Sequence, residues 1–141
     1  MSGRYPYIKK RNYTHMMGED KIIWERFIDK YPKRFDTVDY DWRVGEGIDL
    51  NPDWEDNIMR MANMITQKRI DVLAWNGEQP TIIEVKKRVG LSTLGQVLGY
   101  KELFVTEFKN IDIPDLLVIT ESIGADDRLV LERFNIPVEV V

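Results

Sequence analysis

The chain has 141 residues, 43% of them hydrophobic, which suits one domain with a core of its own. It contains no cysteine, so a disulfide framework and a zinc–thiolate site are both excluded. The net charge of −4 argues mildly against DNA binding by the whole surface, and the lack of a long apolar stretch or signal-peptide core predicts a cytoplasmic protein with no membrane partner.

Residues 1–18 form a leader in which basic and aromatic side chains alternate. The basic residues are Arg4, Lys9, Lys10 and Arg11, and the aromatic residues are Tyr5, Tyr7 and Tyr13. The tyrosines could stack on nucleic-acid bases, and a loosely packed arm with solvated charges is an equal alternative. We therefore expect an N-terminal arm over residues 1–18 and a single domain over residues 19–141.

Residues 19–31 have the periodicity of an amphipathic helix. Its apolar stripe consists of Ile23, Trp24, Phe27, Ile28 and Tyr31. Glu25 lies at the border of this stripe, so it is either an ordinary boundary residue or part of a site beside the helix.

Residues 37–44 alternate apolar and polar side chains, which predicts a strand with one face in water. Residues 51–65 follow as an inserted helix, with Pro52 in its first turn. Acidic residues gather between Glu46 and Asp56. We interpret them as complementing the positive end of that helix dipole rather than as a metal site.

The next two apolar segments predict a hairpin that carries unexpected charges. The segments surround Asp71 and Glu84, and Asn76-Gly77 between them is a strong turn signal, with Pro80 expected to end the ladder. Because side chains alternate along a strand, Glu84 and Lys86 share a face, and Asp71 joins them if the register is right. A carboxylate in a buried sheet needs a partner, which is either a metal ion or a salt bridge to Lys86.

Residues 91–106 predict a helix, with Ser92 or Thr93 as its N-cap. Gln96 and Tyr100 are four residues apart and therefore face the same way. Two interior glycines, Gly95 and Gly99, each cost roughly 1 kcal/mol relative to alanine, which suggests close approach by the sheet or by a phosphate backbone.

The last part of the chain completes an α/β pattern. Residues 116–120 predict a buried strand, and residues 125–135 a helix with Leu129, Val130, Leu131 and Phe134 inside. Residues 138–141 predict a final strand at an edge, which leaves pairing with a second copy, and hence a homodimer, open.

The spacing of Asp71, Glu84 and Lys86 resembles the core of the PD-(D/E)xK nuclease superfamily, although Ile70 stands where that motif has proline. Gln96 and Tyr100 resemble the Gln-x-x-x-Tyr pair of its RecB-like members. The resemblance covers roughly residues 20–120 and implies the restriction-endonuclease-like αβββαβ core, here with an inserted helix and a C-terminal helix and strand.

The resemblance also implies a reaction and its residues. Asp71, Glu84 and the carbonyl of Val85 would hold Mg²⁺ or Mn²⁺, and Lys86 would act on the attacking water or on the phosphate. Glu25 and Gln96 would support the metal site, and Tyr100 would contact the substrate backbone. Such a nuclease cuts phosphodiester bonds to leave 5′-phosphate and 3′-hydroxyl ends, in DNA repair, in recombination or in processing of phage or mobile-element DNA.

Local charge bears on the choice of partner. Lys87 and Arg88 follow the site directly and are candidate phosphate contacts to single-stranded, duplex or branched DNA. The acidic balance keeps a second class open, in which the fold is a catalytically inactive module for nucleic-acid binding or assembly.

Overall fold

The computed structural model describes residues 3–13, 16, 18–45 and 68–141, and a six-stranded mixed sheet forms its centre. The strands are β1 (Tyr5–Pro6), β2 (Thr37–Val44), β3 (Lys68–Asn76), β4 (Gln79–Val89), β5 (Asp115–Ile123) and β6 (Val138–Val140). They lie side by side in chain order, antiparallel from β1 to β4 and parallel from β4 to β6. The helix expected at 51–65 and the acidic cluster at 46–56 lie outside the described residues.

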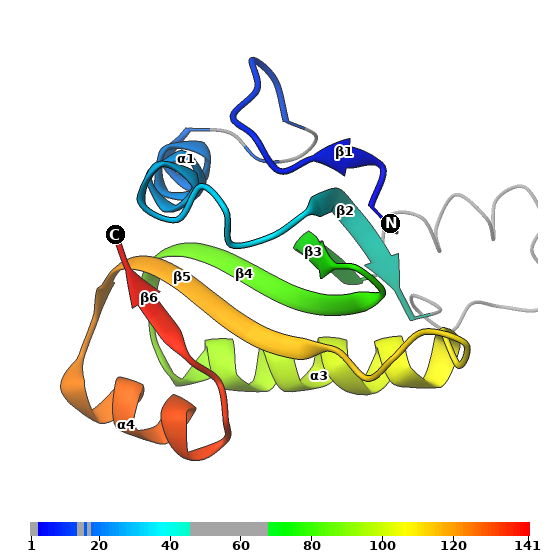
Figure 1. Ribbon diagram of the computed structural model, residues 1–141. Helices are drawn as coiled ribbons and strands as arrows, with labels where there is room; N and C mark the ends of the chain where they lie inside the picture. Colours follow the sequence, from blue (N-terminus) through cyan, green and yellow to red (C-terminus); the bar gives the residue numbers. More distant parts are fainter. Residues whose placement is uncertain (1–2, 14–15, 17, 46–67) are drawn as a thin grey trace, which may run out of the picture.

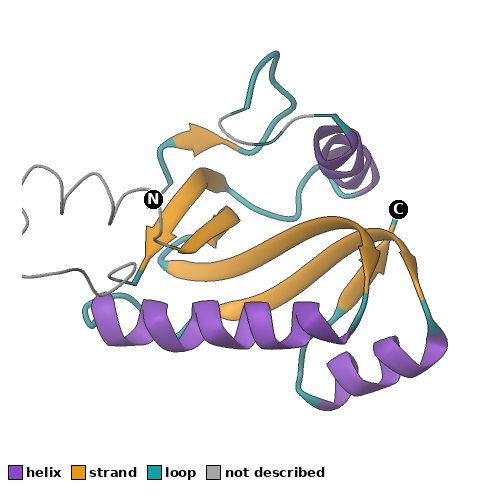
Figure 2. Cartoon of the chain, turned by 180° about the vertical axis from the view of Figure 1, so that it is seen from behind, coloured by secondary structure: helices purple, strands orange, loops and turns teal. Residues whose placement is uncertain are grey.

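Helices cover both faces of this sheet (Figures 1 and 2). One face carries α1 (Glu19–Lys30), and the other carries α3 (Leu91–Glu107) and α4 (Ala125–Arg133). Each interface between a helix and the sheet has its own core. Trp24 and Phe27 of α1 contribute to one core, and Val97 and Phe104 of α3 contribute to the other. The predicted fold class, a mixed sheet between helices in the order αβββαβ with a helix and strand appended, is confirmed.

The leader packs onto the domain. Tyr7 and Tyr13 are buried in the α1 core, and the Tyr7 ring meets the rings of Trp24 and Phe35 edge-on at 5.8 and 5.6 Å. For these two tyrosines both alternatives, stacking on bases and a loosely packed arm, are therefore wrong, because their rings are already enclosed by the domain. The division of the chain at residue 18 stays a prediction.

The predicted wet face of β2 is also wrong. Thr37 and Asp39 are buried because β1 adds a strand beside them, with the Gly3 N–H donating to Thr37 Oγ1 at 2.9 Å. Asp39 accepts hydrogen bonds from the Arg4 N–H and the Trp75 indole N–H, both at 3.0 Å. The burial of Thr37 and Asp39 thus depends on the leader, which lies about seventy residues before Trp75 in the sequence. The local alternation of β2 could not reveal it.

Two local predictions are corrected where strands meet turns or helices. Pro80 lies inside β4 opposite Trp75, one step beyond the Asn76–Gln79 pair that closes the hairpin. Hydrogen-bonded and non-hydrogen-bonded pairs alternate along an antiparallel ladder, so next to the closing pair Pro80 needs no N–H to donate to β3. The N-cap of α3 is Gly90 rather than Ser92 or Thr93, because β4 runs to Val89 and leaves one residue before the helix.

The appended helix α4 buries less than its composition suggests. Leu131 is fully buried beside α3, but Leu129 and Phe134 are 51% and 53% exposed. Neighbouring helical residues point about 100° apart, so this run of apolar residues cannot all face the core. β6 lies at the sheet edge as predicted. Within the described ranges, no helix has the length and apolar character needed to cross a bilayer.

Candidate active site

The site begins where β3 and β4 separate. Their regular pairing runs from Asn76–Gln79 to Val72–Ile83, and the next residues along are Asp71 and Glu84. Here the Val85 N–H donates to Asp71 Oδ2 at 3.0 Å, so a side-chain carboxylate replaces a strand carbonyl as acceptor. The backbone donor thus anchors Asp71 at the opening between the strands.

The faces of β3 change at the same point. Val72 packs in the α1 core, whereas Ile70 packs in the α3 core, although residues two apart normally share a face. On β4, Val85 packs in the α1 core, so Glu84 and Lys86 on either side point toward α3. Glu84 and Lys86 therefore share the α3 side of the sheet, and Asp71 is held beside them in the opening between the strands.

Burial dominates the electrostatics of the two carboxyl groups. Glu84 is only 6% exposed, and its Oε2 has no hydrogen-bond partner among the described residues. Burial raises the pKa of Glu84, and the charge of Asp71 raises it further. Burial also raises the pKa of Asp71, against a smaller opposing effect of the Val85 N–H. Two carboxylates held close in a dry place favour a cation between them.

Gln96 and Tyr100 cover this pair from α3. The Gln96 side-chain amide donates to the Tyr100 hydroxyl at 2.8 Å, so the two side chains form one unit. Burial, and then the charge of Glu84, raise the pKa of Tyr100 to about 12. The charge of Glu84 therefore acts on the Tyr100 hydroxyl, which is protonated at neutral pH.

A groove of about 480 Å³ opens beside these residues. Its lining comprises Lys68, Lys86, Ser92, Gly95, Gln96, Gly99, Tyr100 and Leu103. Since Lys86 and Tyr100 belong to both the groove and the carboxyl site, a ligand in the groove would reach the carboxyl pair. The lining carries two lysines and no carboxylate, which suits an anionic ligand.

Of the α1 carboxylates, the one whose charge acts on the carboxyl pair is not Glu25. Glu25 accepts a hydrogen bond from the Tyr13 hydroxyl at 3.0 Å, on the side of the leader. Asp20, in the first turn of α1, is the residue whose charge raises the pKa of both Asp71 and Glu84. Sequence reasoning missed Asp20. It lies five residues before Glu25 and therefore on a different face of the helix, and nothing in the local pattern singled it out.

Lys87 and Arg88 are exposed on the part of β4 that leaves the site. The Lys87 ammonium pairs with the Glu19 carboxylate of α1 at 2.8 Å. Both partners are largely in solvent, so this pair contributes little to stability and a phosphate could replace Glu19.

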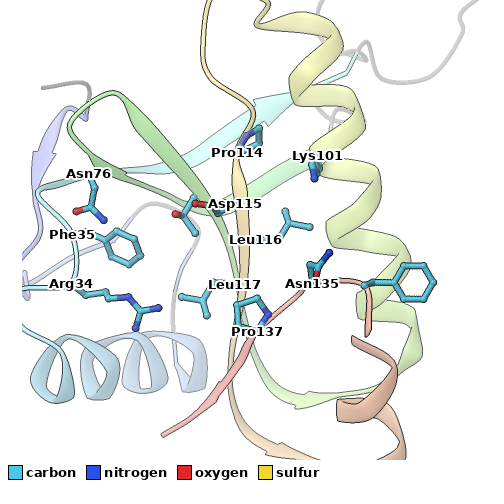
Figure 3. A pocket seen from close by; sticks show the side chains of 12 residues that line it. Arg34, Phe35, Asn76, Lys101, Pro114, Asp115, Leu116, Leu117, Asn135 and Pro137 are labelled. Carbon is cyan, nitrogen blue, oxygen red and sulfur yellow. The ribbon is translucent and has the colours of Figure 1, made fainter. Parts of the chain in front are cut away.

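A second cavity, of about 470 Å³, lies at the other end of the strands (Figure 3). Thr81 and Asp115, which pair near the starts of β4 and β5, line it together with Arg34 and Lys101. It shares no residue with the groove. Lys101 therefore offers a lysine on α3 that is separate from the carboxyl site.

Comparison with known proteins gives a fold relationship only. No family model and no curated protein matches the sequence. The structure is similar to a repair endonuclease from Pyrococcus abyssi, with a TM-score of 0.50 and 12% identity over 94% of this chain and 49% of that one. It is equally similar to the EndoMS-dsDNA2 complex, with a TM-score of 0.50 and 12% identity over 94% of this chain and 48% of that one.

The chain therefore spans about half the length of the solved structures it matches. At this level of identity the likeness defines a class of fold, a nuclease-like mixed sheet flanked by helices. The particular function has to be argued from the site.

Proposed function

We propose that the protein is a Mg²⁺- or Mn²⁺-dependent DNA nuclease of the PD-(D/E)xK superfamily, with the motifs of its RecB-like branch. The observation that carries this proposal is the buried pair Asp71 and Glu84, with Lys86 on the same face and one Glu84 oxygen lacking a partner among the described residues. Lys86 makes no ion pair with another described residue, so a plain salt bridge does not account for the carboxyl pair.

The residues present fit a hard divalent cation. Asp71 and Glu84 would hold it, with the carbonyl of Val85 as a third oxygen. In the described part of the chain, no group of three or more histidine, cysteine, aspartate or glutamate side chains is arranged to hold a metal ion. Mg²⁺ commonly uses one or two protein carboxylates and keeps several waters, so two suffice. When bound, the ion would make a water more acidic and stabilise negative charge on the phosphate.

The other residues act by charge and position. Lys86 neutralises the negative charge that grows on the scissile phosphate as water attacks and the bond to the 3′ oxygen breaks. This leaves a 5′-phosphate and a 3′-hydroxyl. Gln96 holds the Tyr100 hydroxyl over the carboxyl pair, and Tyr100 in turn contacts the substrate. Asp20 takes the supporting role first expected of Glu25, since its charge reaches the pair.

DNA is the substrate that the positive residues around the site favour. One of the similar structures is named as a complex with double-stranded DNA, which supports DNA as a partner of this fold. Lys87 and Arg88 lie where a strand would leave the site, and Lys87 would exchange Glu19 for a phosphate. The biological role that we propose for the nuclease is DNA repair, recombination or the processing of phage or mobile-element DNA.

The test is cleavage of labelled single-stranded, duplex, nicked and branched DNA with Mg²⁺ or Mn²⁺. Asp71→Ala and Lys86→Ala should each reduce the rate at least 100-fold while circular dichroism shows an unchanged fold. Lys101→Ala, which removes a lysine of α3 from the other cavity, should cut at the wild-type rate. If all four DNAs stay intact with both metals, the nuclease proposal fails, and a binding or assembly module becomes the better interpretation.

A further inference from the structure

Helix α3 contains two glycines that its own structure does not explain. Gly95 and Gly99 lie one helical turn apart in the interior of the helix, where glycine costs stability relative to alanine. Neither has the positive φ that only glycine adopts easily, since the positive-φ glycines among the described residues are Gly18, Gly45 and Gly77. Backbone conformation therefore does not require glycine at either position.

Packing does not require it either. A Cβ atom placed on Gly95 or on Gly99 would meet no atom of the described residues within 4 Å. At Gly3, by contrast, a Cβ would lie 2.6 Å from Thr37 Oγ1, so glycine is needed there. Of the two explanations that the sequence allowed, close approach by the sheet is thus ruled out for the described part of the chain.

The space in front of both glycines is the groove described above. Gly95 and Gly99 line it on the α3 side, next to Gln96 and Tyr100, and Lys68 and Lys86 line it as well. Lys68 is exposed at the start of β3 and makes no ion pair with another described residue. The groove is thus lined by helix backbone without side chains at Gly95 and Gly99 and by the ammonium groups of Lys68 and Lys86. Through Lys86 it adjoins the carboxyl pair.

We propose that this groove seats the sugar–phosphate backbone of one DNA strand, lying directly against α3 at Gly95 and Gly99. Glycine is the residue that lets a ligand come this close to the main chain. Lys86 contacts the phosphate to be cut, and Lys68 contacts a neighbouring phosphate of the same strand. The inference rests on the proposed nuclease function and adds the path of the strand.

The first test separates stability from binding. Gly99→Leu replaces glycine by a good helix former, so the melting temperature should stay the same or rise. The leucine side chain fills the groove, so affinity for fluorescent single-stranded and duplex oligonucleotides, measured by anisotropy in EDTA, should fall at least tenfold. Gly95→Ala adds only a methyl group and should reduce affinity about threefold while also raising the melting temperature.

The second test concerns charge. Lys68→Ala should weaken binding and reduce the slope of log affinity against log salt by about 1, as expected for one lost phosphate contact. Lys101 lines the cavity of Figure 3, outside the groove. Lys101→Ala removes the same charge there and should leave the affinity and the salt slope near the wild-type values. If Lys68→Ala loses affinity for only one of the two oligonucleotides, that oligonucleotide shows whether the strand comes from single-stranded or duplex DNA.

The outcomes distinguish this inference from the nuclease proposal. Wild-type affinity in Gly99→Leu would overturn the groove path even if the enzyme cuts DNA. Loss of affinity in that variant, with a wild-type protein that binds but never cuts, would keep the path and reject the nuclease proposal. A wild-type protein that binds neither oligonucleotide would overturn the path as well.

Discussion

The substitution Glu84→Gln should stabilise the metal-free protein at neutral and alkaline pH. Burial raises the pKa of Glu84, which is only 6% exposed, to about 9 in the folded protein, so at neutral pH folding must return a proton that the unfolded chain has lost. Glutamine keeps the shape of Glu84 and cannot ionise, so it removes this cost. A pKa difference of one between the folded and unfolded states corresponds to about 1.4 kcal/mol. We expect a gain of about 2 kcal/mol, which for a domain of this size is about 4–8 °C in melting temperature.

The sign of the pH dependence follows from the raised pKa of Glu84. Below the ordinary glutamate value of 4.5 the carboxyl is protonated in both the folded and the unfolded state. As pH rises above that value, the unfolded chain loses its proton first, so the free energy of unfolding falls until the folded state also ionises. The advantage of Glu84→Gln should therefore be near zero at pH 4, large at pH 8, and full only where the folded carboxyl also ionises, at a pKa of about 9.

The assay is thermal unfolding in EDTA from pH 4 to pH 9. Glu102→Gln, an exposed change on α3, serves as the control and should behave as the wild type does. Adding Mg²⁺ at 100 times its dissociation constant should raise wild-type stability by about 2.7 kcal/mol, and the gain should vanish in Glu84→Gln. If Glu84→Gln is no more stable than the wild type at pH 8, or if its gain is equal at pH 4 and pH 8, the explanation by a buried carboxyl with a raised pKa is refuted.

Two further predictions concern the fold around the site. Asp39→Ala should cost about 2 kcal/mol in urea unfolding, because it leaves the indole N–H of Trp75 and the N–H of Arg4 without their acceptor, whereas an unchanged midpoint would contradict that role. Tyr7→Ala should cost about 3 kcal/mol, since its buried ring belongs to the α1 core and its hydroxyl donates to the Tyr31 carbonyl, and a loss under about 0.5 kcal/mol would mean that the leader does not pack on the domain.

Local pattern was enough to predict the main elements and the proximity of Asp71, Glu84 and Lys86. The helix α1 and the strand β2 were predicted to within a residue because their apolar residues follow helical or strand periodicity over a sufficient length. The turn at Gly77, with φ of 59°, sets the register of the hairpin, which ends at the Val72–Ile83 pair and so leaves Asp71 and Glu84 as the next residues on the two strands. Alternation along β4 then placed Lys86 beside them.

Errors arose where a distant segment supplies the environment. The buried face of β2 depends on the leader, which pairs with Thr37 from thirty-four positions away in the chain. Whether Asp20 or Glu25 reaches the carboxyl pair depends on how α1 is rotated against β4. Helical periodicity identifies the buried stripe of a helix but does not say which end of it lies over the neighbouring strand.

By itself the sequence determined the order of elements and the residue types of the site, because periodicity and turn chemistry are local properties of the chain. Only the tertiary structure decided how dry the site is, since the burial that raises the pKa of Glu84 comes from packing of β3, β4 and α3 together. It also decided the meaning of Gly95 and Gly99, which face an open groove rather than the sheet.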